Sequence, residues 1–101
     1  MGVPELHYIR ALQNLAHALA YAESTKKAKQ LYEERSEEVL KQFIFEKKAE
    51  ISSNEFYYLA GRATQCTIDE AYDMGTDAFN AAAGGIGLFE ELIGIEESVD
   101  D

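Results

Sequence analysis

Apolar residues recur every three or four positions along most of the chain, and strict alternation of apolar and polar residues is absent. Spacing of this kind is typical of amphipathic helices and not of strands. Two apolar stripes precede residue 50. The first consists of Leu6, Ile9, Leu12, Leu15, Ala16 and Leu19, and the second of Ala28, Tyr32, Val39 and Phe43. The pattern therefore predicts an all-α protein.

The two stripes would point in nearly opposite directions, about 180° apart, if they lay on one continuous helix. Two structures explain this. The chain either breaks around Glu23 to Thr25 and folds back as a helical hairpin, or forms one long helix over residues 4–50. Residues 23–25 contain no Gly, Pro or capping box that would decide for the break. The continuous helix would favour a homo-oligomer, because its two halves would pack on different partners.

Two capping boxes predict further helices after residue 50. Ser52 with Glu55 predicts a helix over about 53–65. Thr67 with Glu70 predicts another that begins at Thr67 and ends at the glycines 84–85.

A short amphipathic helix follows the glycines in this prediction. We therefore expect a small bundle of about four helices, with a long N-terminal helix or helical hairpin. The chain of 101 residues is expected to form a single domain over 1–95, with a loose acidic tail at 96–101.

The helix predicted from Thr67 has two contrasting faces. Its small, apolar face consists of Ile68, Ala71, Gly75, Ala78, Phe79 and Ala82. Its polar face consists of Asp69, Glu70, Asp73, Asp77 and Asn80. Carboxylates at this spacing repel one another by a few tenths of a kcal/mol per pair. Asp69 and Glu70 would gain from the positive helix N-terminus, whereas Asp77 would not.

Charge is unevenly distributed along the chain, whose net charge is −10. Residues 1–62 contain nine basic and nine acidic residues, whereas residues 63–101 contain ten acidic residues and no basic one. Nucleic acid requires the opposite sign, so direct nucleic-acid binding is not expected. A protein partner with a basic surface is the natural counterpart of the acidic third.

The row Asp69, Asp73 and Asp77 has three interpretations. It is a solvated helix face, a docking strip for Arg and Lys residues of a partner, or a carboxylate metal site. The third is the least favoured, because a di-iron bundle needs Glu-x-x-His motifs and neither His7 nor His17 has Glu three positions before it. No metal and no cofactor are therefore expected.

Catalytic motifs are absent from the sequence. Cys66 is the only cysteine, and no histidine lies close to it in sequence. The glycines between residues 83 and 88 are not followed by the Lys-Ser/Thr pair of a phosphate-binding loop. The sequence therefore predicts a protein that is not an enzyme.

The segment containing Leu88, Phe89 and Leu92 either closes the bundle as a short helix or enters a groove on a partner as a linear motif. GIGLF resembles the peptide with which proteins bind the bacterial sliding clamp, through its Leu-Phe pair, with Gly84 or Gly85 where that peptide has Gln. GLFEELIGI resembles acidic peptides that enter membranes when protonated. Without a basic face, no membrane binding is expected at neutral pH.

These observations predict a small acidic adaptor or inhibitor in the cytoplasm that binds a basic protein surface, such as that of a nucleic-acid-handling host protein. Phage-encoded inhibitors share this size and acidity. A self-assembling structural subunit is the alternative. The predicted partner-binding residues are Asp69, Glu70, Asp73, Asp77, Leu88, Phe89 and Leu92.

Overall fold

The computed structural model describes residues 4–94, so the predicted acidic tail at 96–101 lies outside the described residues. Within them the chain is all-α, as predicted, with five helices instead of about four. They are α1 (Pro4–Tyr21), α2 (Thr25–Glu33), α3 (Glu37–Lys48), α4 (Ser53–Met74) and α5 (Thr76–Ile93).

The N-terminal half adopts the hairpin and not the continuous helix. Ser24 caps α2, since its side chain accepts a hydrogen bond from the backbone N–H of Lys27 at 3.1 Å. A second break, which the stripes do not predict, separates α2 from α3. There Ser36 caps α3, and Glu37 and Glu38 occupy the first turn, where the helix dipole favours negative charge.

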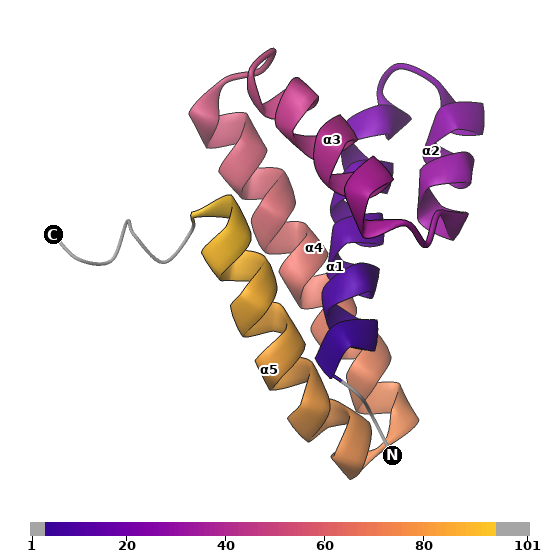
Figure 1. Ribbon diagram of the computed structural model, residues 1–101, viewed down its shortest axis with the longest axis vertical. Coiled ribbons are helices and arrows are strands. Elements are labelled where there is room, and N and C mark those ends of the chain that lie inside the picture. The colour runs from indigo at the N-terminus through magenta and orange to yellow at the C-terminus, as the bar shows by residue number, and fades with distance from the viewer. Residues whose placement is uncertain (1–3, 95–101) are drawn as a thin grey trace, which may run out of the picture.

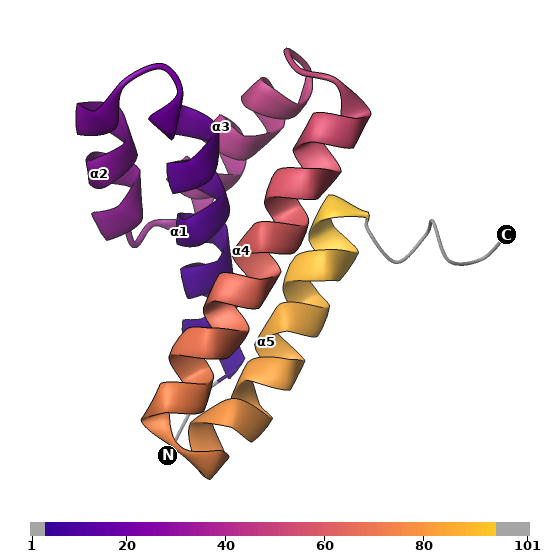
Figure 2. The same cartoon turned by 180° about the vertical axis from the view of Figure 1, so that it is seen from behind.

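Helix α1 is the centre of the molecule and packs against each of the other four helices (Figure 1). The antiparallel helices α4 and α5 lie on one side of α1, and α2 lies on the other side (Figure 2). All five helices contribute to one core. Its buried members are Ala11, Leu12, Leu15, Ala16, Leu19, Ala20, Ala28, Leu31, Leu40, Ile44, Phe56, Ala60, Ala63, Phe89 and Ile93.

Most of the first stripe therefore faces the core, and only its first residue, Leu6, is exposed. The second stripe is divided: Ala28 is buried and Phe43 packs against the core, whereas Tyr32 and Val39 are exposed. Helix α3 instead buries Leu40 and Ile44. The buried positions of α3 differ from the predicted ones because the break between α2 and α3 gives α3 a new helix axis. The face that α3 turns to the core therefore cannot be extrapolated from α2.

The helix predicted to start at Thr67 does not begin there. The cap at Ser52 is confirmed, since its hydroxyl accepts from the N–H of Glu55 at 3.1 Å, but α4 then continues without interruption to Met74. Thr67 is fully buried, and its hydroxyl donates to the carbonyl of Ala63, one turn earlier, at 2.8 Å. A Thr-x-x-Glu pattern thus occurs inside a helix when the hydroxyl has other partners.

The actual break lies at Gly75, and the predicted stop at Gly84-Gly85 is wrong. Gly75 has φ 115° and ψ 175°, a conformation that only glycine adopts readily, and it separates α4 from α5. Helix α5 runs through Gly84 and Gly85 and ends at Gly94, whose φ of 83° is left-handed. Packing of the face that includes Ile86 and Phe89 holds α5 together despite its glycines.

Candidate functional site

The break at Gly75 divides the predicted acidic row between two helices. Asp69 and Asp73 lie on α4, whereas Asp77 lies in the first turn of α5. The expected effect of the helix dipole is therefore reversed. Asp77 gains from the positive N-terminus of α5, while Asp69 and Asp73 lie in the C-terminal half of α4, away from its positive end.

Glu70 is not a free carboxylate but the centre of a network that joins three helices. Arg10 of α1 pairs with it, with Nε 3.3 Å from Oε1. The Tyr32 hydroxyl of α2 donates to Oε2 at 3.3 Å, and Asn14 Nδ2 of α1 donates to Oε1 at 3.3 Å. Arg10 also lies over the Tyr32 ring, 4.4 Å from its centroid. The basic N-terminal half thus does supply one cation to the acidic third.

The three carboxylates of the acidic row itself form no ion pair with any residue in the range 4–94. Asp69, Asp73 and Asp77 are all exposed. Asp69 accepts a hydrogen bond from Gln65 at 3.0 Å. These three charges remain available to an external cation.

Large apolar side chains are exposed beside these carboxylates, at the corner where α4 meets α5. Tyr72 and Met74 have exposed fractions of 72% and 68%, and Phe79 of α5 is 44% exposed. The rings of Tyr72 and Phe79 meet edge to face, with centroids 6.0 Å apart. Sequence reasoning placed Phe79 on the buried face and missed Tyr72 and Met74. The signal for those two was that they flank Asp73 within an acidic run.

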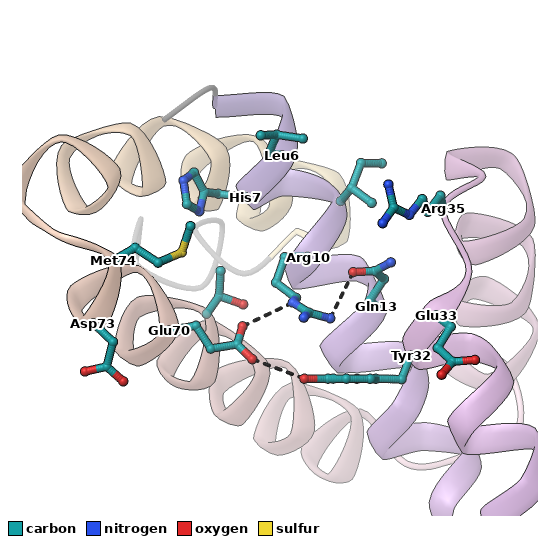
Figure 3. Close-up of a pocket in the computed structure, with 12 residues that line it drawn as sticks. Leu6, His7, Arg10, Gln13, Tyr32, Glu33, Arg35, Glu70, Asp73 and Met74 are labelled. Carbon is teal, nitrogen blue, oxygen red and sulfur yellow. Dashed lines mark hydrogen bonds and ion pairs between the residues drawn. The ribbon is translucent and has the colours of Figure 1, made fainter. Parts of the chain in front are cut away.

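Two hollows open beside this corner. The larger, of about 910 Å³, lies between α1, α2 and α4 (Figure 3). The smaller, of about 310 Å³, lies where α1 approaches the α4–α5 corner. Leu6, His7 and Met74 line both. We call the two hollows together the α1 groove.

The network of Glu70 lies in the larger hollow of the α1 groove. In Figure 3 the Arg10 side chain reaches toward Glu70 on one side and Gln13 on the other, while the Tyr32 ring lies below it. Arg10 Nη1 donates to Gln13 Oε1 at 3.1 Å. Asp73 lines the larger hollow and Asp77 the smaller. The groove thus brings one free carboxylate from each of α4 and α5 next to a satisfied polar wall.

The apolar segment of residues 88–92 packs within its own bundle. Phe89 is fully buried in the core, and Leu92 packs against that core. Leu88 alone remains largely exposed. Insertion of Leu88 and Phe89 together into a partner would require α5 to leave α1, so the structure brings only Leu88 of this set to the surface.

The single thiol lies on the surface of α4, near the acidic row. Burial of part of the side chain raises the pKa of Cys66, and the charges of Glu70 and Asp69 raise it further. A raised pKa makes a poor nucleophile at neutral pH.

The described residues contain no helix long and apolar enough to cross a membrane. Within the same range, no three His, Cys, Asp or Glu side chains come together in a way that could hold a metal ion. No protein-family model, curated protein or solved structure matches this chain. The features of this chain that bear on function are therefore the exposed carboxylates and apolar side chains where α4 meets α5, and the α1 groove beside them.

Proposed function

We propose that this protein is a small non-enzymatic binding module, an adaptor or an inhibitor, that engages a basic surface of another protein. The observation that carries the proposal is the exposure of Tyr72 and Met74 beside carboxylates that have no cation among residues 4–94. Aromatic residues and Met are enriched at protein interfaces, where they bury much area at low entropic cost. Neighbouring charges select the partner and its orientation.

Charge indicates the class of partner. Surfaces that bind nucleic acid must be rich in Arg and Lys, and they attract an acidic protein by the same forces. A nucleic-acid-handling protein whose basic surface is covered by this module is therefore the partner that we propose. Such a module would compete with nucleic acid, and its binding would weaken as salt is raised.

Affinity capture from a cell extract tests this proposal. The immobilised protein is compared with the variant Asp69→Asn, Asp73→Asn and Asp77→Asn. A matched control, Glu38→Gln, Glu46→Gln and Glu91→Gln, removes three exposed acidic charges elsewhere. We expect wild type and control to retain the same basic protein at low salt, and the aspartate variant to lose it.

Equal retention by all three proteins at low salt would contradict the proposal. Circular dichroism of each variant checks that helicity is unchanged, as is expected for exposed positions.

Self-assembly is the alternative function. The hairpin buries most of the first apolar stripe within one chain, and it leaves Tyr32 and Val39 of the second stripe exposed. Sedimentation at micromolar concentration tests it, and we expect a monomer.

A further inference from the structure

The wall of the α1 groove is preorganised, because its polar groups already bind one another. Glu70 accepts from Arg10, Tyr32 and Asn14, and Gln13 accepts from Arg10. Pairing of this kind fixes the positions of side chains that would otherwise have to be ordered on binding. The polar side chains of this wall are therefore already ordered before a ligand binds.

The carboxylates at the edges of the groove are not paired. Glu33 of α2, Asp73 of α4 and Asp77 of α5 are exposed and form no ion pair with the described residues. Arg35 is the one further cation that lines the groove. Once the Arg10–Glu70 pair is set aside, acidic groups outnumber basic ones, and those near the α4–α5 corner are acidic only.

His7 is a second observation that points to a ligand. Its exposed fraction is 5%, it lines both hollows, and it forms no hydrogen bond with any residue between 4 and 94. Its ring nitrogens are not among the buried atoms without a partner in the described residues, so they are open to the hollows and not sealed in the core. A donor from a ligand in the groove would supply the bond that a neutral imidazole accepts.

Apolar side chains at the mouth of the groove add a surface for the stem of a long side chain. Leu6 is 64% exposed and Met74 68% exposed, and both line the two hollows. Methionine adapts to partners of varied shape, and the methylene groups of Arg and Lys pack well on such surfaces.

We propose that a basic peptide segment of the partner protein binds in the α1 groove, with an Arg or Lys stem against Leu6 and Met74 and with its cationic groups toward Asp73 in the larger hollow and Asp77 in the smaller. This inference rests on the proposed function and says where on this protein the partner's basic surface binds. Charge complementarity selects the occupant, because an acidic segment would meet Asp73 and Asp77 without a free cation near them. The two hollows share Leu6, His7 and Met74 as lining residues, so a segment of several residues could contact both.

An NMR titration of the ¹⁵N-labelled protein tests the site. The probe is the peptide acetyl-Arg-Ala-Arg-Ala-Arg-amide, and its control is the same peptide with citrulline in place of arginine. We expect the arginine peptide to shift the amide signals of Leu6, His7, Met74 and Thr76. The citrulline peptide should shift them little, because it lacks the charge.

Two variants locate the contact more sharply. The double variant Asp73→Asn and Asp77→Asn should weaken binding of the arginine peptide about tenfold, the loss of roughly one charge-assisted hydrogen bond. The single variant Asp69→Asn, outside the groove, should weaken it less than twofold. Met74→Ala should weaken binding without changing the salt dependence.

Two results would contradict binding in the groove and leave the proposed function standing. In the first, the amide shift changes are confined to the outer face of α4 and Asp69→Asn weakens peptide binding as much as the double variant. In the second, no binding is detected at millimolar peptide. The proposed function is judged separately by the capture experiment, so the two can fail independently.

Discussion

Nε of Arg10 lies 3.3 Å from Oε1 of Glu70, and this pair joins the first helix of the chain to the fourth. Because of this pair, the Glu70 carboxylate is neutralised within the chain and lines the α1 groove, instead of remaining a free surface charge. Both side chains remain about one third exposed, so the pair is screened by water and its net stabilisation is modest.

Replacing Glu70 with Gln should lower the free energy of unfolding by about 0.5–1 kcal/mol. The charge is lost, but the amide oxygen still accepts from Tyr32 or Asn14. Urea denaturation measures the change. Asp73→Asn is the matched control, because Asp73 has no ion pair among residues 4–94, and it should change stability by less than about 0.5 kcal/mol. Equal effects of the two variants would contradict a structural role for the pair.

Thr67 and Thr64 give a sharper pair of variants, because both lie on α4 and only one hydroxyl is used. Thr67 Oγ1 accepts from Asn14 Nδ2 at 2.9 Å, whereas Thr64 Oγ1 is buried with no partner in the described part of the chain. Thr67→Val should cost about 1–3 kcal/mol, since it deprives the buried Asn14 amide of an acceptor.

Thr64→Val should be neutral or stabilising, because it removes a buried polar group that nothing satisfies. Thermal denaturation of the two variants compares them directly. Similar losses in both would show that the hydroxyl at Thr67 contributes nothing specific.

Gly75 should tolerate substitution worst among the glycines in open surroundings. No heavy atom would contact an added Cβ at Gly75, Gly61 or Gly87, so crowding does not distinguish them. Backbone conformation does. With φ at 115°, Gly75→Ala should cost about 1–3 kcal/mol.

Replacing the two glycines that lie inside helices should raise the free energy of unfolding instead of lowering it. Gly61→Ala and Gly87→Ala should each stabilise by about 0.5–1 kcal/mol, because alanine restricts the unfolded chain and favours a helix. Guanidinium denaturation of the three variants tests this. An increase in stability on Gly75→Ala would contradict the positive φ at the junction of α4 and α5.

Cys66 should react slowly with iodoacetamide at pH 8. Burial, Glu70 and Asp69 raise the pKa of its thiol, so the thiolate fraction at this pH is lower than in free cysteine. The rate should rise with pH through a midpoint above the usual value for cysteine. Asp69→Asn should lower the pKa and speed alkylation at pH 8, whereas the more distant Asp77→Asn should not. A midpoint at the free-cysteine value would contradict this electrostatic account.

Local patterns in the sequence were enough for the helical class, the cap at Ser52 and the region of the first break. The repeat of apolar positions and the capping hydroxyl each act within one or two turns, so they can be read from neighbouring residues. The same local reasoning failed at Thr67, whose hydroxyl is satisfied by Ala63 and Asn14, and at Gly84 and Gly85, which packing holds in a helix.

By itself, the sequence determined that this protein is helical and that its excess negative charge lies beyond residue 62, because both follow from composition and local periodicity. Only the tertiary structure decided which of those charges are free. Arg10 reaches Glu70 across the bundle while Asp73 and Asp77 remain without a cation among residues 4–94. That division depends on how α1 crosses α4, a relationship between residues far apart in the chain that no local pattern records.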